Sequence, residues 1–305
     1  MCLPRLLRRN LGVYFMLLAS LSYALTGLFA KLASIELSSI EVIFFRNTMG
    51  AAFIFYLMAK APSKKPGGRP WLLLWRGVVG TLSLVAFFYN IAHINLGAAF
   101  SFQRTSPLFL ALIAFFIFKE RLSRVAIFGI LLSFLGMLFV MQPSANSGLD
   151  FKNSCLGIFS GLSAAAALAS VRSLGRFYST NAIVLSFFGT GALLAFFGMS
   201  VAEFLDKGHW LLEYDFLFSS FLMPSAKTWI FLGIMGVFSL AYQIYVTKSY
   251  RVAKKTGLVA GVGYCDIIFT LLLGLIIGDF LPNIYALFGV ILIVLGGLIL
   301  TLFKA

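Results

Sequence analysis

The chain of 305 residues is 61% hydrophobic and only 11% charged, and its formal net charge at pH 7 is +14. A soluble globular domain has about 45–50% apolar and about 25% charged residues, so a soluble protein of this composition would expose large apolar patches. The composition excludes a soluble enzyme and predicts an integral membrane protein. Nucleic-acid binding is not indicated, because the basic residues form short clusters between apolar runs, as topology signals do.

Apolar windows bounded by charged or turn-forming residues predict an all-α polytopic protein with ten membrane spans, since about 20 apolar residues cross the hydrocarbon core. The first window is interpreted as an uncleaved span rather than a signal peptide, because no A-x-A site follows it. The long link, residues 203–227, is expected to lie at the membrane interface on the mouth of the bundle. The predicted spans are Leu11–Ala30, Ile43–Ala59, Gly77–Ala92, Leu96–Phe118, Val125–Met141, Cys155–Val171, Ala182–Ala202, Trp229–Thr247, Gly257–Ile277 and Ile284–Phe303.

The 24 Lys and Arg residues divide unequally between the two ends of this predicted bundle. All but six fall on the side of the N-terminus. The six are Arg46 and Arg104, placed in or near the membrane, and Lys31, Lys152, Lys207 and Lys227 on the opposite side. The positive-inside rule then predicts that both termini are cytoplasmic, in a bacterial inner membrane or its equivalent.

An internal repeat is visible at an offset of 160 residues. It pairs Gly97 with Gly257, Phe109 with Phe269, Gly129 with Gly289, and Gly136 with Gly296. Because each half has an odd number of spans, the second copy must enter the membrane from the opposite side. We therefore predict two inverted five-helix repeats, residues 1–145 and 146–305, a common construction of secondary transporters with the substrate site at the midplane between the halves.

The fourth span carries Arg104 in its first half, and Asp266 stands 162 positions later in the ninth span. An arginine in hydrocarbon costs at least about 2.5–3.5 kcal/mol, so this helix face should meet protein or water. We expect both side chains to face a central cavity, where they hold a substrate carboxylate and amine or pair with each other when the cavity is empty. The alternative is a structural ion pair that only keeps the repeats in register.

Other polar and aromatic residues are candidates for the same cavity. Arg46 is placed one turn into the second span, where it either snorkels to the outer surface or closes a gate with Glu41. Aromatic and amide side chains either stack on and bind a substrate or simply pack within the bundle. They are Tyr89, Asn90, Gln103, Tyr242, Tyr245 and Tyr264.

The chain resembles EamA-type members of the drug/metabolite transporter superfamily over nearly its whole length. The resemblance is carried by Phe44-Phe45-Arg46, by Ser106-Pro107-Leu108-Phe109 and by Lys119-Glu120-Arg121-Leu122. Trp75-Arg76-Gly77, Tyr89-Asn90 and Gln103 are similar to the branch of the human SLC35G-type proteins. The resemblance implies two inverted repeats around a central cavity that move a small polar metabolite by alternating access.

The sequence departs from the family at two places. Ile267 stands at the repeat position of Pro107, and Gly278-Asp279 stands where the family often has a Gly-Glu pair. The first span also lacks the glutamate through which the small multidrug-resistance relatives exchange protons. Proton antiport by that route is not expected, and a coupling ion, proton or other, is left open.

No catalytic residue, metal site or cofactor is predicted. The histidines and the three cysteines have no ligand or redox spacing, and no phosphate-binding loop is present. The expected partners are a small-molecule substrate and membrane lipids, with a homodimer left open. Two alternatives to a transporter are a membrane-embedded enzyme acting on a lipid-linked substrate and a scaffold that transports nothing.

Overall fold

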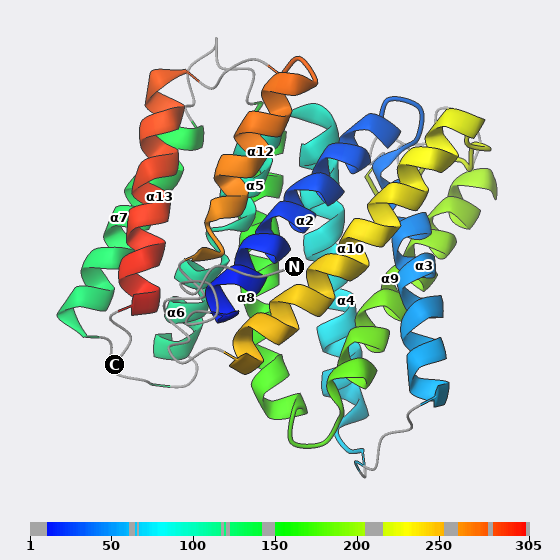
Figure 1. The fold of residues 1–305 in the computed structure, drawn as a ribbon, viewed down its shortest axis with the longest axis horizontal. Coiled ribbons are helices and arrows are strands. Elements are labelled where there is room, and N and C mark those ends of the chain that lie inside the picture. Colours follow the sequence, from blue (N-terminus) through cyan, green and yellow to red (C-terminus); the bar gives the residue numbers. More distant parts are fainter. Residues whose placement is uncertain are drawn as a thin grey trace.

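The computed structural model describes residues 11–60, 65, 67–116, 119, 123–141, 150–204, 216–252, 262–279 and 283–302. Regular secondary structure in these ranges is helical throughout, as Figure 1 shows. The helices are α2 (Leu11–Ala33), α3 (Ser39–Lys60), α4 (Pro70–His93), α5 (Leu96–Gln103), α6 (Ser106–Phe116), α7 (Arg124–Met141), α8 (Phe151–Leu174), α9 (Thr180–Phe204), α10 (Ala226–Val252), α12 (Cys265–Ile276) and α13 (Ile284–Leu302).

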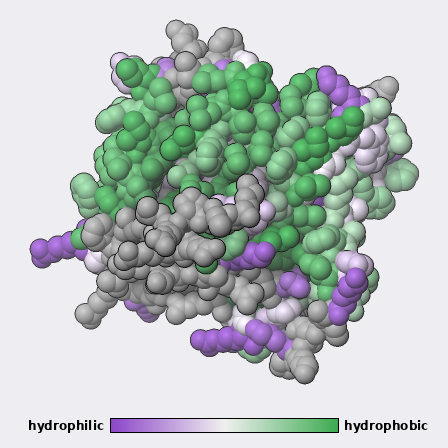
Figure 2. Space-filling model, viewed as in Figure 1, coloured by the Kyte–Doolittle hydropathy of each residue, from purple (hydrophilic) through white to green (hydrophobic). Residues whose placement is uncertain are grey.

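The bundle has the surface of a membrane protein. Six described helices, α2, α3, α4, α8, α9 and α10, are long and apolar enough to cross a membrane, and α7, α12 and α13 contain shorter apolar segments. Large hydrophobic side chains such as Phe55, Leu193 and Ile276 are well exposed on the outside. In Figure 2 hydrophobic residues cover most of the coloured face, with hydrophilic ones toward its edges. The prediction of an all-helical, multi-pass membrane protein is confirmed for the described residues.

The fourth predicted span is not one continuous helix. It breaks into α5 and α6, because Pro107 has no N–H to donate and its ring excludes a regular helix turn before it. Arg104 ends α5, and its backbone N–H still bonds to the carbonyl of Phe100 at 2.9 Å. Thr105 starts the next turn by accepting the N–H groups of Leu108 and Phe109 at 2.9 and 3.2 Å. The break places Arg104 at the junction of two short helices.

The ninth predicted span has an interruption at the corresponding place. Residues 257–261 lie outside the described part of the chain, and α12 begins at Cys265 after a turn at Gly263 and Tyr264. The N–H of Asp266 bonds back to the carbonyl of Gly263 at 3.3 Å. Asp266 therefore lies in the first turn of α12, where the helix dipole favours a negative charge.

The described helices pack mainly in pairs that join the two halves of the chain. α2 packs on α10, α4 on α8, α3 on α9, and α7 on α13. The junction of α5 and α6 lies between α8 and α12, while α12 also packs on α2. The hydrophobic core follows these contacts and contains Phe87, Phe88, Phe100 and Phe102, all nearly inaccessible to solvent.

The described part of the long link, residues 216–225, covers one end of the bundle. The Phe216 ring contacts Tyr89 of α4 at a centroid distance of 5.6 Å. The N–H of Leu222 donates a hydrogen bond of 2.6 Å to the carboxylate of Glu41 in α3. The link thus lies on the ends of α3 and α4, and residues 205–215 fall outside the described ranges.

Candidate functional site

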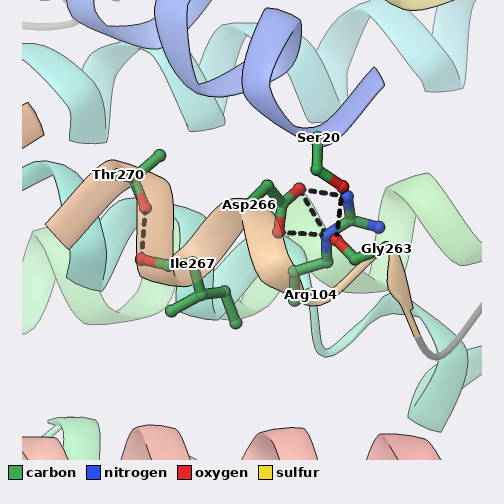
Figure 3. Close-up of polar contacts among 6 residues, drawn as sticks. All are labelled: Ser20, Arg104, Gly263, Asp266, Ile267 and Thr270. Carbon is green, nitrogen blue, oxygen red and sulfur yellow. Dashed lines mark hydrogen bonds and ion pairs between the residues drawn. The ribbon is translucent and has the colours of Figure 1, made fainter. Parts of the chain in front are cut away.

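Arg104 and Asp266 form an ion pair between the two halves of the chain. The Nε atom of Arg104 donates to both carboxylate oxygens of Asp266, at 3.0 and 2.8 Å, and its Nη2 also pairs with Oδ2. Figure 3 shows the guanidinium directed at the carboxylate beside Ser20 of α2. Asp266 is completely buried, while 22% of the Arg104 side chain is exposed. The structure therefore contains the predicted charge pair, with the two residues in contact with each other.

Tyrosines surround this pair. The guanidinium carbon of Arg104 lies 5.9 Å from the centre of the Tyr23 ring and 6.0 Å from that of Tyr264. Tyr23 stacks on Tyr242 at 4.5 Å, so α2, α10 and the turn before α12 all supply rings to one place. Cation–π contacts of this kind favour a guanidinium in a poorly solvated site. Of the predicted residues, Arg104, Asp266, Tyr242 and Tyr264 come together here.

Sequence reasoning missed Tyr23 and Ser20 on α2. Ser20 is buried and donates a hydrogen bond of 3.3 Å to the carbonyl of Gly263, in the turn that leads to Asp266. The available signal was a stripe of polar and small residues, because Ser20, Tyr23 and Gly27 recur on one face of the first span at helical spacing. This face packs toward Phe100 and the ion pair.

The other aromatic and amide residues that were candidates for the cavity have partners in other parts of the bundle. Gln103 accepts a hydrogen bond from the Ser160 hydroxyl at 3.0 Å, on the α8 side of the junction. Asn90 donates to the carbonyl of Asn153 at 3.0 Å. Tyr89 stacks on His93 near the end of α4, with 3.9 Å between the ring centres, and the ring centre of Tyr245 lies 6.3 Å from that of Phe15. The structure does not gather these four side chains around the ion pair.

Arg46 and Glu41 have different partners. Arg46 is 4% exposed and donates from Nη1 to Oδ1 of Asn47 at 3.0 Å. Glu41 is completely buried and accepts from the N–H and hydroxyl of Ser38, each at 2.9 Å, and from the N–H of Leu222. This arrangement caps α3 in the manner of a capping box. The two charged side chains are not brought together.

Three carboxylates tie the two halves together at the end of the bundle where α2 meets α3. We call Glu36, Glu41 and Asp279 the acidic end; the connection from α2 to α3 is at the top of Figure 1. Asp279 accepts from Lys31 Nζ at 2.5 Å and from the N–H of Leu96, in the first turn of α5, at 2.9 Å. The residue that departs from the family's Gly-Glu pair therefore links α2, α5 and the end of α12.

Glu36 makes the third of these ties, outside the spanning helices. Its carboxylate accepts from the N–H and hydroxyl of Ser225, both at 2.7 Å, and from the hydroxyl of Thr228 in α10. These hydrogen bonds, that of Thr228 first, lower the pKa of Glu36 below its ordinary value. The carboxylate therefore stabilises the folded protein at pH values above about 4.5, and this contribution is lost as the pH falls through the lowered pKa.

We expect this contribution to appear in the melting temperature. Between pH 7 and pH 3, the melting temperature of wild type should fall more steeply than that of Glu36→Gln, and the two curves should converge at the acid end. The exposed Glu203 of α9 offers a control, since Glu203→Gln should follow wild type. Parallel curves for wild type and Glu36→Gln would contradict the assignment.

Within the described ranges, no three or more His, Cys, Asp or Glu residues are grouped to hold a metal ion. Cys155 and Cys265 are free thiols. The polar groups described in contact around Tyr23 and Tyr264 are thus the Arg104–Asp266 ion pair, with its carboxylate buried, and the neighbouring hydroxyl and phenol groups. Such a site can bind and release a polar solute through charge-assisted hydrogen bonds.

Comparison with known proteins identifies relatives of this chain. The EamA-like transporter family matches residues 10–142. The pseudopaline exporter CntI of Pseudomonas aeruginosa is 30% identical over 285 residues, which cover 93% of each chain. Human solute carrier family 35 member G1 is 24% identical over 93% of this chain and 77% of its own length. A transporter of Helicobacter pylori is 29% identical over 95% of this chain and 94% of its own.

A solved crystal structure shares the fold, with a TM-score of 0.60 over 93% of this chain and 96% of that chain at 16% sequence identity. The likeness thus covers the whole bundle, and the sequence relatives match through both halves of the chain. The helices, the buried charge pair and these relatives lead to one conclusion. The chain belongs to the EamA-type transporters of the drug/metabolite transporter superfamily.

Proposed function

We propose that the protein is a secondary transporter that moves a small polar metabolite across a bacterial inner membrane by alternating access. The observation that carries the proposal is the Arg104–Asp266 pair, which lies between the halves at the junction of α5 and α6 and in the first turn of α12, with its carboxylate buried. Intramembrane charges are expensive, and in transporters they mark substrate or ion pathways. Interrupted helices near mid-membrane likewise form the sites of many secondary transporters.

The proposal includes two inverted five-helix repeats, residues 1–145 and 146–305. The packing of the helices supports it, because exchanging the halves converts the α2–α10 contact into the α8–α4 contact and leaves α3–α9 and α7–α13 unchanged. The close contacts at the glycines of α7 and α13 are also exchanged when the halves are exchanged. A Cβ atom added at Gly136 would lie 2.6 Å from the carbonyl oxygen of Gly289, and one added at Gly296 would lie 2.6 Å from that of Gly129.

The ion pair suggests how a substrate is held. A buried pair is stable only while each charge has a partner, so opening it in an apolar site requires a replacement for both. A substrate with a carboxylate and an amine replaces both, the carboxylate at Arg104 and the amine at Asp266. The tyrosines around the pair then contact the body of the substrate. The pair re-forms after release and returns the empty protein to a stable state.

The acidic end offers a gate for this cycle. Glu36, Glu41 and Asp279 each join the first half to the second through hydrogen bonds at one end of the bundle. Rocking of the halves must break these ties, and they re-form when that end closes. The charge distribution supports an N-terminus and a C-terminus in the cytoplasm, which places the acidic end on the opposite side.

Counterflow in proteoliposomes tests transport directly. Vesicles with purified protein are preloaded with one unlabelled solute from a panel of amino acids, nucleosides, vitamins and organic acids, and uptake of the same labelled solute is followed. We expect transient accumulation above equilibrium for at least one member, and not in vesicles without protein. The absence of accumulation across the panel, with protein shown to be folded, would count against a transporter of small polar metabolites.

A further inference from the structure

A second guanidinium, Arg46 of α3, is buried in the bundle and has no acidic partner in the described part of the chain. Only 4% of it is exposed, and its Nη1 atom donates a hydrogen bond to the neutral amide of Asn47. Its Nε atom has no acceptor among the described residues. The rings of Phe188 and Phe88 lie 5.3 and 5.8 Å from its guanidinium carbon. These contacts accommodate a cation without neutralising its charge.

Arg46 and the ion pair belong to the same region. A chain of aromatic contacts joins them. The Arg46 guanidinium carbon lies 5.8 Å from the centre of the Phe88 ring, Phe88 contacts Phe87 at a centroid distance of 5.8 Å, and Phe87 contacts Tyr23 at 6.0 Å. Tyr23 in turn lies 5.9 Å, from ring centre to guanidinium carbon, from Arg104. The two guanidinium groups thus lie at the two ends of one continuous group of rings, Phe88, Phe87 and Tyr23.

The charges of this region do not balance. An arginine stays protonated in proteins, and the carboxylate of Asp266 is already engaged by Arg104. Among the described residues, the region around Tyr23 therefore holds two guanidinium groups against one carboxylate. A buried ion without a counter-ion is unfavourable, and a guanidinium with a free N–H is a donor suited to a carboxylate or phosphate oxygen.

We infer that Arg46 binds an anionic group of the transported molecule, so the substrate carries one more negative than positive charge. This inference rests on the proposed function and extends it. The carboxylate and amine that replace Arg104 and Asp266 leave the charge of the region unchanged, and a second anionic group neutralises Arg46. The substrate class is therefore an organic anion, such as an amino dicarboxylic acid or a phosphorylated amine, rather than a neutral zwitterion or a cation.

Matched ligands that differ by one anionic group test this inference. Glutamate is compared with glutamine, succinate with succinamate, and phosphoethanolamine with ethanolamine, by thermal shift and by inhibition of counterflow. We expect the more anionic member of at least one pair to bind wild type tenfold or more tightly. A preference in the first or second pair would indicate that Arg46 binds a carboxylate, and a preference in the third would indicate a phosphate.

The variants Arg46→Gln and Arg46→Lys separate binding from a packing role. Loss of a charged hydrogen bond should lower the ratio of affinities within the responding pair by about 10- to 100-fold in Arg46→Gln, while Arg46→Lys keeps part of it. If Arg46 only packs, its substitution would weaken the binding of both members of the pair alike and leave the ratio of affinities unchanged. Should Arg46→Gln not fold, the ratio in wild type and in Arg46→Lys decides.

Two results would overturn the inference. One is equal or tighter binding of the less anionic member in every pair, including a failure of all anions to bind. The other is an unchanged ratio in folded Arg46→Gln. Counterflow of neutral or cationic solutes without a preference for anions would overturn this inference but leave the proposed transporter intact, whereas the absence of any counterflow would count against the transporter itself.

Discussion

Asp266→Asn is expected to abolish transport and to destabilise the protein strongly. The substitution leaves the Arg104 guanidinium in the bundle without its counter-ion, and breaking a buried pair in this way costs about 3–5 kcal/mol. Transport should fall to background, because the group proposed to bind the substrate amine is gone. Chemical unfolding in mixed micelles and proteoliposome counterflow measure the two effects. The exposed Asp150, which makes no side-chain capping bond before α8, provides the control Asp150→Asn, for which no change is expected.

The double variant Arg104→Gln/Asp266→Asn decides between the two readings of the pair. It removes both charges and leaves two amides that can bond to each other, so most of the lost stability should return. Transport should remain at background if the charges bind substrate. A double variant that is stable and transports at the wild-type rate would mean that the pair only holds the halves in register.

Gly136→Ala is expected to destabilise the bundle by about 1–3 kcal/mol, the usual cost of overpacking a tight interface. The added Cβ would lie 2.6 Å from the carbonyl oxygen of Gly289 and 2.7 Å from the backbone nitrogen of Ile293. Backbone atoms cannot rotate away, so α7 and α13 must separate along their contact. Small residues at such interfaces permit the close approach of membrane helices. The measurement is the free energy of unfolding in mixed micelles.

The same interface gives a matched control and a test of its symmetry. At Gly189 of α9 a Cβ would meet nothing within 4 Å, so Gly189→Ala should be neutral or slightly stabilising through helix propensity. Gly296→Ala should resemble Gly136→Ala. The double variant should cost less than the two single effects added together, because the first substitution already moves the helices apart. Strict additivity would contradict a shared contact.

Pro107 illustrates the border between local sequence and structure. Pro107 stands within an apolar run, and the sequence predicts one span from Leu96 to Phe118. The structure has two helices, with Arg104 at their junction. A proline favours such a break locally, but whether a membrane helix kinks or divides depends on the partners that satisfy the freed backbone groups. Here the helix starts again at once, since the Thr105 carbonyl accepts the N–H groups of Leu108 and Phe109.

The fates of Arg46 and Glu41 show a further limit. Both were recognised as charges near the membrane, and their closeness in sequence suggested a pair or a route to the surface. In the fold Glu41 caps α3 and binds the link before α10, while Arg46 lies among the rings of α4 and α9. These partners come from segments far away in the chain, so no local pattern could name them.

The sequence by itself determined that this is a multi-pass membrane protein of the EamA type with Arg104 and Asp266 turned away from lipid. The reason is that the free energy of transfer into a bilayer is a sum over neighbouring residues, so apolar runs and costly charges are legible in order along the chain. Only the tertiary structure decided that the two charges touch, that Tyr23 joins them, and that Arg46 has no carboxylate among the described residues. Partner choice depends on distances of a few ångströms between helices, and those distances are set by the packing of the whole bundle.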